Sequence, residues 1–401
     1  MIRDPRGQGR RLLLSQIRKS GKIARVDLAR NTGISQATVT AITAELIREG
    51  LIEETERVMD GRDVRRGRPR VDLKLRGDSH RVAGIKVADS SLSVVVLDFE
   101  GRLLAEHLVQ IDRRAYGTAE IVSQVQRALS EAAGIAGLRA SDISGVGIGL
   151  AGFMDADNGI AHWSPSLTDR NVPLRDILQE SLNIPVFLDN DVNLVAMAEL
   201  YFGQGRNIDD FIVVTIESGV GAGIVIGGQL YRGARGYGGE FGHVKVQLDG
   251  ALCRCGQRGC LEAYVADYAL LREASVSTRF VETEQNAQRI HKLIDAARNG
   301  DATARTIIER AGRMFALGLA NLVNMFDPEL IIMSGERMQF DFLYAEEVMD
   351  SIAEQTVHSD MRPPEVVIHK WGDMMWAKGA AAFAIDGVAE LAMEGMDGNA
   401  A

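Results

Sequence analysis

The feature that most constrains this chain is a cysteine-rich stretch from residue 238 to residue 264, which reads GGEFGHVKVQLDGALCRCGQRGCLEAY. It holds all three cysteines of the protein, in the pattern His243-x9-Cys253-x-Cys255-x4-Cys260. Three thiolates and one imidazole make a complete tetrahedral set for Zn²⁺ and leave no position for water, so the predicted site is structural. The alternative is a cysteine-rich turn with free thiols, because three cysteines cannot all pair as disulfides.

Two carboxylates, Glu240 and Glu262, flank this cluster. A closed zinc loop would hold both in place, and fixed carboxylates can accept hydrogen bonds from vicinal sugar hydroxyls. The alternative is a pair of solvated surface glutamates. GGEFGH followed by CRCGQRGCLE resembles the signature of the ROK family of repressors, open reading frames and sugar kinases. The resemblance implies a two-lobed actin-like ATPase (sugar kinase-like) body, and leaves open whether the chain is a kinase or a repressor.

The distribution of charge separates a basic head from an acidic body. Residues 1–76 hold 18 Lys and Arg against 10 Asp and Glu, whereas the remainder holds 27 against 45, so that the whole chain carries −10. A basic head is attracted to a polyanion and an acidic body is repelled by it. This asymmetry indicates a nucleic-acid-binding head joined to a body with another role.

The head reads as a helix-turn-helix. Apolar spacing predicts helices at 10–20 and 25–32, a tight turn at Gly33, and a third helix capped by Ser35 that ends near Gly50. Small residues at the start of that helix would face DNA bases in a major groove. The alternative is a three-helix bundle that contacts protein. The candidate DNA-contacting residues here are Ser35, Gln36, Ala37, Thr38 and Thr40.

Alternating apolar residues predict two strands after the third helix, 51–53 and 71–75, joined by DGRDVRRGRPR. A hairpin with a basic tip that follows a helix-turn-helix is typical of a wing. Arg68, between Gly67 and Pro69, suits a narrow minor groove, and its neighbours suit phosphates. The wing residues predicted to contact DNA are Arg65, Arg66, Arg68 and Arg70. The layout resembles the winged head of ROK repressors, which the ROK kinases lack.

From residue 81 the pattern changes to an α/β body. Three strands at 82–87, 92–98 and 103–110, a helix at 119–134 and strands at 146–150 and 185–188 precede a helix that ends near Leu200. A second run of strands begins at 211, which fits the duplicated lobes that the resemblance implies. We expect three parts: a winged head at 1–76, a first lobe at 81–190 completed by a C-terminal helix at 376–395, and a second lobe at 191–375.

The segment Asp189-Asn190-Asp191 follows a strand, where α/β sheets place their ligands. By itself it could equally be a helix N-cap. The resemblance implies a sugar between the two lobes, with Asp191 at the position of the kinase base. It assigns the sugar contacts to Ser166, Asn190, Asp191, Glu240, His243 and Glu262. Ser166 stands where many family members carry Asn, so the identity of the sugar stays open.

The expected phosphate loops are altered. Family kinases carry Asp-x-Gly-Gly-Thr where this chain has Lys86-Val87-Ala88-Asp89-Ser90, and Gly-Thr-Gly where it has Glu217-Ser218-Gly219. The Gly-Gly expected on the adenosine side is Ser334-Gly335. Carboxylates placed beside phosphate disfavour ATP, since two unit charges ~4 Å apart repel by ~4 kcal/mol at an effective dielectric of 20. We therefore expect no catalytic residues and no enzyme activity.

The sequence thus predicts a sugar-responsive transcriptional repressor with structural Zn²⁺. Its expected partners are an inverted-repeat operator, a monosaccharide or sugar-phosphate effector and further copies of itself, as a homodimer or homotetramer. The alternatives are a sugar kinase with an accessory head and an adaptor with a vestigial pocket. No apolar run approaches the roughly 18 residues that span a bilayer, and MIRDPRGQGRR lacks the apolar core of a signal peptide. These features predict a cytoplasmic protein without a membrane segment.

Overall fold

The computed structural model describes residues 5–56, 71–88, 91–111, 115–216, 219–275, 286–335, 346–357, 364–369 and 374–398. The chain forms two compact units: Met1–Tyr201 together with Met374–Ala401, and Phe202–Asp373. The first unit combines the head, one α/β lobe and the C-terminal helix. Among the described residues, none of the helices has the length and apolar character needed to span a bilayer.

Three helices and a small sheet form the head. They are α1 (Pro5–Ser20), α2 (Arg25–Thr32) and α3 (Gln36–Arg48), with strands β1 (Ile23–Ala24), β2 (Ile52–Glu56) and β3 (Val71–Leu75) in the order β1-β3-β2. Gly33 ends α2 at φ 70°, a left-handed conformation that costs glycine little. Ser35 starts α3 by accepting a hydrogen bond from Thr38 N at 3.2 Å. The helix-turn-helix predicted from these two residues is confirmed.

The apolar residues that predicted these helices include Leu14, Ile17, Leu28, Val39, Ile42 and Leu46, all of which are buried. Val26, another apolar residue of α2, keeps 53% of its surface exposed. β2 and β3 pair antiparallel from Ile52 opposite Leu75 to Glu56 opposite Val71, which gives the two strands of the predicted wing. The tip that carries Arg65, Arg66, Arg68 and Arg70 lies outside the described residues, so its DNA contacts stay predictions.

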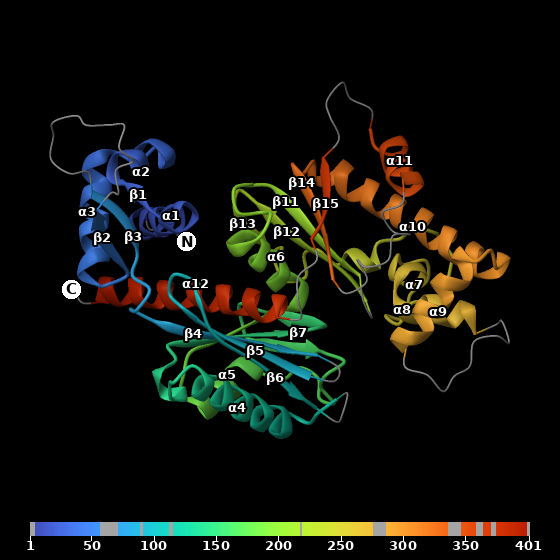
Figure 1. The fold of residues 1–401 in the computed structure, drawn as a ribbon, viewed down its shortest axis with the longest axis horizontal. Coiled ribbons are helices and arrows are strands. Elements are labelled where there is room, and N and C mark those ends of the chain that lie inside the picture. Colours follow the sequence, from blue (N-terminus) through green and yellow to red (C-terminus); the bar gives the residue numbers. More distant parts are fainter. Residues whose placement is uncertain are drawn as a thin grey trace. The chain divides into compact units, whose positions relative to one another are not determined.

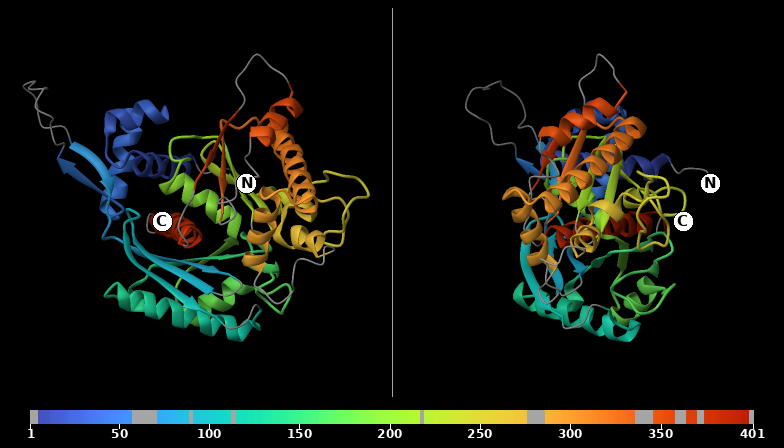
Figure 2. Two further views of the ribbon diagram at one scale, coloured as in Figure 1. Left: turned by 45° about the vertical axis from the view of Figure 1, so that its right-hand side comes forward. Right: turned by 90° about the vertical axis from the view of Figure 1, so that its right-hand side faces the viewer.

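The lobe of the first unit is built on a five-stranded sheet of order β10-β7-β4-β5-β6. Its strands are β4 (Arg81–Val87), β5 (Ser91–Asp98), β6 (Leu103–Gln110), β7 (Gly145–Leu150) and β10 (Val186–Asn190). β4, β7 and β10 are parallel, β5 is antiparallel to β4, and β6 is antiparallel to β5. Helices α4 (Thr118–Ile135) and α5 (Leu174–Leu182) lie on one face and α12 (Met375–Gly398) on the other, as two sets of views show (Figures 1 and 2).

Two glycines allow α12 to lie directly on the sheet. A Cβ added at Gly84 would lie 2.0 Å from Ala377 O, and one added at Gly147 would lie 1.9 Å from Ala380 O. Both distances are far below van der Waals contact, so only glycine fits at these positions on the sheet. The C-terminal helix therefore completes the first lobe, although it follows the second lobe in sequence.

The second unit repeats the strand order of the first. Its sheet, β13-β12-β11-β14-β15, again has a three-strand antiparallel meander followed by two parallel strands. The strands are β11 (Phe211–Ile216), β12 (Val220–Ile226), β13 (Gln229–Tyr231), β14 (Leu330–Ser334) and β15 (Glu365–Ile368). The helices are α7 (Glu262–Val265), α8 (Asp267–Ala274), α9 (Asn286–Arg298), α10 (Ala302–Phe326) and α11 (Glu346–Gln355). The duplicated α/β fold class predicted from sequence is confirmed.

Some elements differ from the sequence-based expectations. α6 (Asp191–Phe202) had been assigned to the second lobe, but the units divide after Tyr201, so that almost all of this helix belongs to the first. Its apolar residues pack against α12, where a Cβ added at Gly379 would lie 1.7 Å from Leu194 O. The sequence patterns also did not predict α5, α7, α8, α9, β15 or the hairpin of β8 (Phe153–Asp155) and β9 (Ile160–Trp163).

Candidate metal centre and ligand-binding residues

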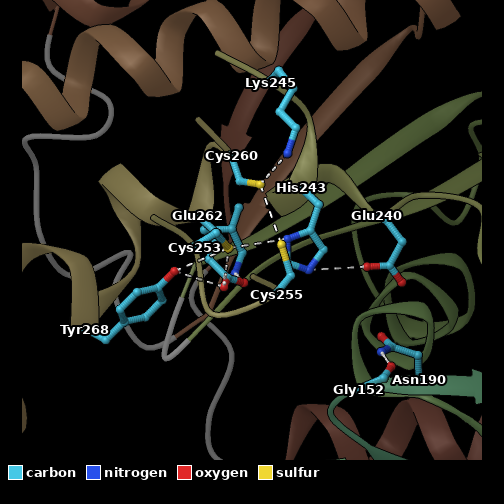
Figure 3. A network of polar contacts seen from close by, with 11 residues as sticks. Gly152, Asn190, Glu240, His243, Lys245, Cys253, Cys255, Cys260, Glu262 and Tyr268 are labelled. Carbon is cyan, nitrogen blue, oxygen red and sulfur yellow. Dashed lines mark hydrogen bonds and ion pairs between the residues drawn. The ribbon is translucent and has the colours of Figure 1, made fainter. Parts of the chain in front are cut away.

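Four side chains of the second unit converge on one point. His243 ends the short turn η2 (Phe241–His243), and the three cysteines lie on the loop before α7. The candidate ligand atoms of His243, Cys253, Cys255 and Cys260 all lie within 4.8 Å of one another. Cys255 Sγ is 3.8 Å from Cys260 Sγ, and Cys253 Sγ is 3.7 Å from His243 Nδ1 (Figure 3). A tetrahedral ion with metal–sulfur bonds of about 2.3 Å separates its sulfur ligands by about 3.8 Å, so this cluster fits a metal ion.

The loop geometry explains how distant ligands meet. Isolated bridges pair Lys245 with Cys260 and Leu252 with Arg258, which folds the loop back on itself. Gly259 sits at the fold with φ 76°, and a Cβ there would lie 1.8 Å from a backbone oxygen. Glycine is therefore required at position 259 by the close approach of two backbone segments.

The two ring nitrogens of His243 face different partners. Nδ1 points to Cys253 and the metal position, whereas Nε2 lies 3.9 Å from Glu240 Oε2. A metal held by Nδ1 leaves the proton on Nε2, directed at the Glu240 carboxylate. The ring thus links the metal position to a carboxylate that the sequence assigned to sugar binding.

The charge at the cluster favours a bound divalent cation once the thiols have lost their protons. Burial raises the pKa of the Cys253 thiol, so metal binding must displace its proton. Three thiolates around a divalent ion leave a net charge of −1. Lys245 Nζ donates a hydrogen bond to Cys260 Sγ at 2.9 Å, which places a positive charge against this excess. The sequence analysis did not single out Lys245. The feature that could have identified it is the position of a positively charged residue inside the cysteine motif.

Glu262 is held beside the cluster by Tyr268, a second residue that the sequence analysis missed. The Tyr268 hydroxyl lies 3.3 Å from Glu262 Oε1 and 3.5 Å from Cys253 Sγ. Val220 N is 3.5 Å from the other carboxylate oxygen of Glu262. Burial raises the pKa of Tyr268, so its hydroxyl stays protonated and can donate to the carboxylate. Arg254 covers the tyrosine ring, 3.9 Å from the centroid.

Glu240 has an unusual titration. Burial of the carboxylate and the nearby charge of Glu262 raise the pKa of Glu240 to about 7, although its side chain keeps 40% of its surface exposed. The Glu240 carboxylate can accept hydrogen bonds from sugar hydroxyls.

The first unit holds the other residues assigned to sugar binding. Asp191, the first residue of α6, lies 3.5 Å from Lys86 Nζ, and its side chain keeps 21% of its surface exposed. Lys86 is itself enclosed by the Trp376 ring, with Nζ 3.8 Å from the centroid. The family resemblance aligns Lys86 with the aspartate of the kinase loop, which adds a positive charge to the carboxylates that the sequence analysis counted there.

Asn190 and Ser166 are less available to a ligand than the sequence suggested, because Asn190 is hydrogen-bonded and Ser166 is buried. Asn190 Nδ2 donates to Gly152 O at 2.6 Å, and its Oδ1 accepts from Val192 N at 2.9 Å. The helix-capping alternative for Asn190 is therefore realised, and one amide hydrogen is left for a ligand. Ser166 keeps only 2% of its surface exposed.

In the head, the residues predicted to contact DNA bases are exposed. Ser35, Gln36, Ala37, Thr38 and Thr40 all face solvent at the start of α3. Their neighbours Val39 and Ile42 are buried on the opposite side of the helix. The exposed end of α3 is thus free to approach a base edge.

The altered phosphate loops include four residues that lie outside the described part of the chain. Asp89, Ser90, Glu217 and Ser218 lie outside the described residues, so the repulsion argued from two of these carboxylates stays a prediction. On the expected adenosine side, Ser334 is fully buried and its Oγ lies 3.4 Å from His369 O.

Comparisons with known proteins cover both parts of the chain. Residues 82–387 match the ROK family, and residues 10–53 match the winged helix-turn-helix DNA-binding family. The xylose repressor of Caldicellulosiruptor bescii is 29% identical over 382 residues, which covers 93% of this chain and 94% of the relative.

Two solved structures illustrate the two branches of the family. A ROK family transcriptional regulator, described as a homologue of the E. coli MLC protein, superposes with a TM-score of 0.75 at 25% identity and covers 96% of this chain and 98% of its own. A ROK family glucokinase from Streptomyces griseus, in complex with glucose and AMPPNP, gives a TM-score of 0.63 at 30% identity, with 76% of this chain and 99% of its own covered.

Proposed function

Because the chain belongs to the ROK family and carries a winged helix-turn-helix head, we propose that it is a transcriptional repressor whose DNA binding responds to a sugar. The observation that carries the proposal is the similarity to a xylose repressor across 93% of the chain, so that head and body are matched together. The exposed polar start of α3 supports the DNA-binding part.

The metal at the Cys3His cluster is, we propose, Zn²⁺ in a structural role. All four tetrahedral positions are filled by protein ligands, three of them thiolates, which is the donor set that selects zinc. When bound, the ion ties the two ends of the loop together. His243 and Tyr268 then hold Glu240 and Glu262 in fixed orientations.

The sugar ligands are proposed from the family resemblance and from the local geometry. Asp191 and Glu240 are the strongest candidates, because each presents a partly exposed carboxylate that neighbouring groups hold in place. Asn190, His243 and Glu262 complete the set. Ser166 is the weakest member, since it is buried in this conformation.

A sugar kinase is the second candidate, favoured by the similarity to a glucokinase with bound glucose and AMPPNP. Two features oppose it. Lys86 replaces the loop aspartate and forms an ion pair with Asp191, the carboxylate at the position of the catalytic base. The DNA-binding head also has no role in phosphoryl transfer.

The experiment that tests the proposal uses the full-length protein and two readouts. Selection from a randomised duplex library gives the preferred DNA sequence, and operator affinity is then titrated with and without sugars such as xylose and glucose. We expect one sugar to change the operator Kd by about tenfold, within the usual range of coupling free energies. Failure to enrich any sequence, or rapid ATP-dependent phosphorylation of a sugar, overturns the proposal.

A further inference from the structure

One arginine near the end of α1 contacts two residues of the lobe in the first unit. Arg18 donates a hydrogen bond to the Tyr201 hydroxyl and forms an ion pair with Asp386, with Nη1 2.6 Å from Oδ1. The guanidinium also lies over the Tyr201 ring, 4.6 Å from its centroid. The Arg18 side chain is only 15% exposed, and its Nε is buried without a hydrogen-bond partner among the residues that the structure describes. We call Arg18, Tyr201 and Asp386 the joint.

The two partners of Arg18 lie on two helices that both begin at the Lys86–Asp191 pair. Asp191 is the first residue of α6, and Tyr201 follows ten residues later. Trp376, which covers Lys86, is the second residue of α12, and Asp386 follows ten residues later. At 1.5 Å per residue, each helix spans about 15 Å between the ion pair and the joint.

The two helices are fixed to each other between their ends. The close approach of α12 at Gly379 to Leu194 O of α6 leaves no room for a Cβ. At one end Lys86 contacts both Asp191 and Trp376, and at the other Arg18 contacts both Tyr201 and Asp386. Because the helices are held together in the middle and bridged at both ends, a displacement of one helix against the other changes the spacing of the contacts at the ends.

We propose that the α6–α12 pair transmits the state of Asp191 to the DNA-binding head through the joint. The inference rests on the proposed function, since Asp191 is taken as a sugar ligand. A sugar that binds Asp191 draws it from Lys86 and shifts the starts of both helices. A planar guanidinium cannot keep the ring contact and the carboxylate contact once their spacing changes, so the head takes a different pose on the body.

The test measures sugar coupling in three variants of the full-length protein: Arg18→Met, Tyr201→Phe and Asp386→Asn. Coupling is the ratio of the operator Kd with saturating sugar to the operator Kd without it. We expect that ratio to move about fivefold or more toward one in Arg18→Met and Asp386→Asn, with a smaller shift in Tyr201→Phe. Sugar affinity, measured by calorimetry without DNA, should stay within about twofold of wild type, since no variant touches the sugar residues.

The matched control is Arg11→Met. Arg11 lies on the same helix and pairs with Glu390 on α12, but the two side chains are 61% and 46% exposed, so this pair contributes little. Arg11→Met should keep the wild-type ratio. Wild-type coupling in Arg18→Met and Asp386→Asn, or an equal loss in Arg11→Met, overturns the inference.

Two further outcomes distinguish a failure of this inference from a failure of the proposed function on which it rests. If the wild-type protein shows no sugar effect on operator affinity, the proposed function fails before the joint is tested. If Arg18 contacted a DNA phosphate directly, Arg18→Met would lower the salt dependence of binding by about one unit per head. Asp386→Asn removes no positive charge, so its loss of coupling with an unchanged salt slope supports the joint, and retention of coupling there contradicts it.

Discussion

At the scale of single residues, the cysteine cluster and its neighbours form a chain of contacts. His243 joins the metal position to Glu240, Tyr268 joins Cys253 to Glu262, and Lys245 offsets the charge on Cys260. A metal held by the four ligands thereby orients two carboxylates that a free loop would leave mobile. The metal is thus expected to act on sugar binding only through the residues that surround it.

Cys255→Ser should remove the bound zinc and weaken the sugar response. Cys255 is the exposed thiol of the cluster, so the substitution leaves the buried packing of Cys253 and Cys260 in place. Structural zinc contributes about 10–16 kcal/mol of apparent binding free energy in small zinc peptides, which makes its loss strongly felt. Metal analysis of freshly purified protein should give one zinc per wild-type chain and much less in the variant. A wild-type protein without zinc would sink the assignment.

Asp191→Ala should abolish the sugar response, so that operator affinity no longer depends on sugar. The change removes a hydroxyl acceptor, at a cost of about 1–3 kcal/mol for the group left unpaired, and also leaves Lys86 without its carboxylate. The loss of sugar binding is measured by thermal shift. Sugar at 100 times its Kd should add about 2.7 kcal/mol to the stability of the wild-type protein and nothing to that of the variant. Asp142→Ala, at a half-buried carboxylate paired with Arg139, is the control. Equal sugar stabilisation in both variants contradicts the role of Asp191.

At the scale of elements, glycines decide where helices meet. Gly84, Gly147 and Gly379 stand where α12 approaches the sheet or α6, and each would bring a Cβ within 2.0 Å of a backbone oxygen. Gly134, on the exposed side of α4, has nothing within 4 Å of such an atom. Gly379 of α12 is therefore needed for close packing, whereas Gly134 of α4 is not.

Gly379→Ala should destabilise the protein, whereas Gly134→Ala should not. Overpacking against Leu194 O costs about 1–3 kcal/mol or more, because backbone must move. Alanine at Gly134 removes backbone freedom from the unfolded chain and stabilises a helix by about 0.5–1 kcal/mol. Thermal unfolding of the two variants side by side gives the comparison. A midpoint for Gly379→Ala at or above that of Gly134→Ala would show that α6 and α12 do not pack this closely.

The wing is the second element for which we make a prediction, and it concerns DNA affinity. Arg68→Ala should weaken binding most on operators with A·T-rich flanks, because narrow minor grooves concentrate negative potential. Arg66→Ala should weaken binding to all sequences about equally and lower the salt slope by about one unit per head. Titration of both variants on A·T-rich and G·C-rich flanks at two salt concentrations separates them. Identical behaviour on every flank would make the tip a sequence-independent basic loop.

At the scale of the whole molecule, a basic head and an acidic body have different roles. The head, residues 1–76, carries +8 and is attracted to DNA, whereas the remainder carries −18 and is repelled by it. One winged head buries too little surface for tight specific binding, and two heads on one operator supply the rest. This is why a homo-oligomer is expected.

The protein should bind an inverted repeat as a dimer. Two heads related by a twofold axis reach half-sites about one helical turn apart, on the order of 34–36 Å. Sedimentation of the protein with a selected operator should give two chains per duplex. Insertion of half a turn between the half-sites should reduce affinity by about tenfold or more, since the heads then face opposite sides. Equal affinity for a single half-site would refute the symmetric arrangement.

The sequence by itself determined the features that depend on short-range spacing. Ligand spacing from His243 to Cys260 predicted a metal cluster, Gly33 and Ser35 marked the turn of the head, and alternation predicted the strands of both lobes. Each of these signals lies within about twenty residues, where covalent geometry limits the possible conformations. The same local reading divided the lobes before α6, since a strand and a following helix give no sign of which lobe the helix packs on.

Only the tertiary structure decided which distant residues meet. Lys86 faces Asp191, and Arg18 lies between Tyr201 and Asp386, although these partners are separated by 105, 183 and 368 positions. Such pairs follow from how α6 and α12 pack on the first sheet, and close packing depends on backbone approach at glycines that look alike in sequence. The sequence thus predicted what the chain binds, and the packing of α6 and α12 decided which distant residues of the first unit meet.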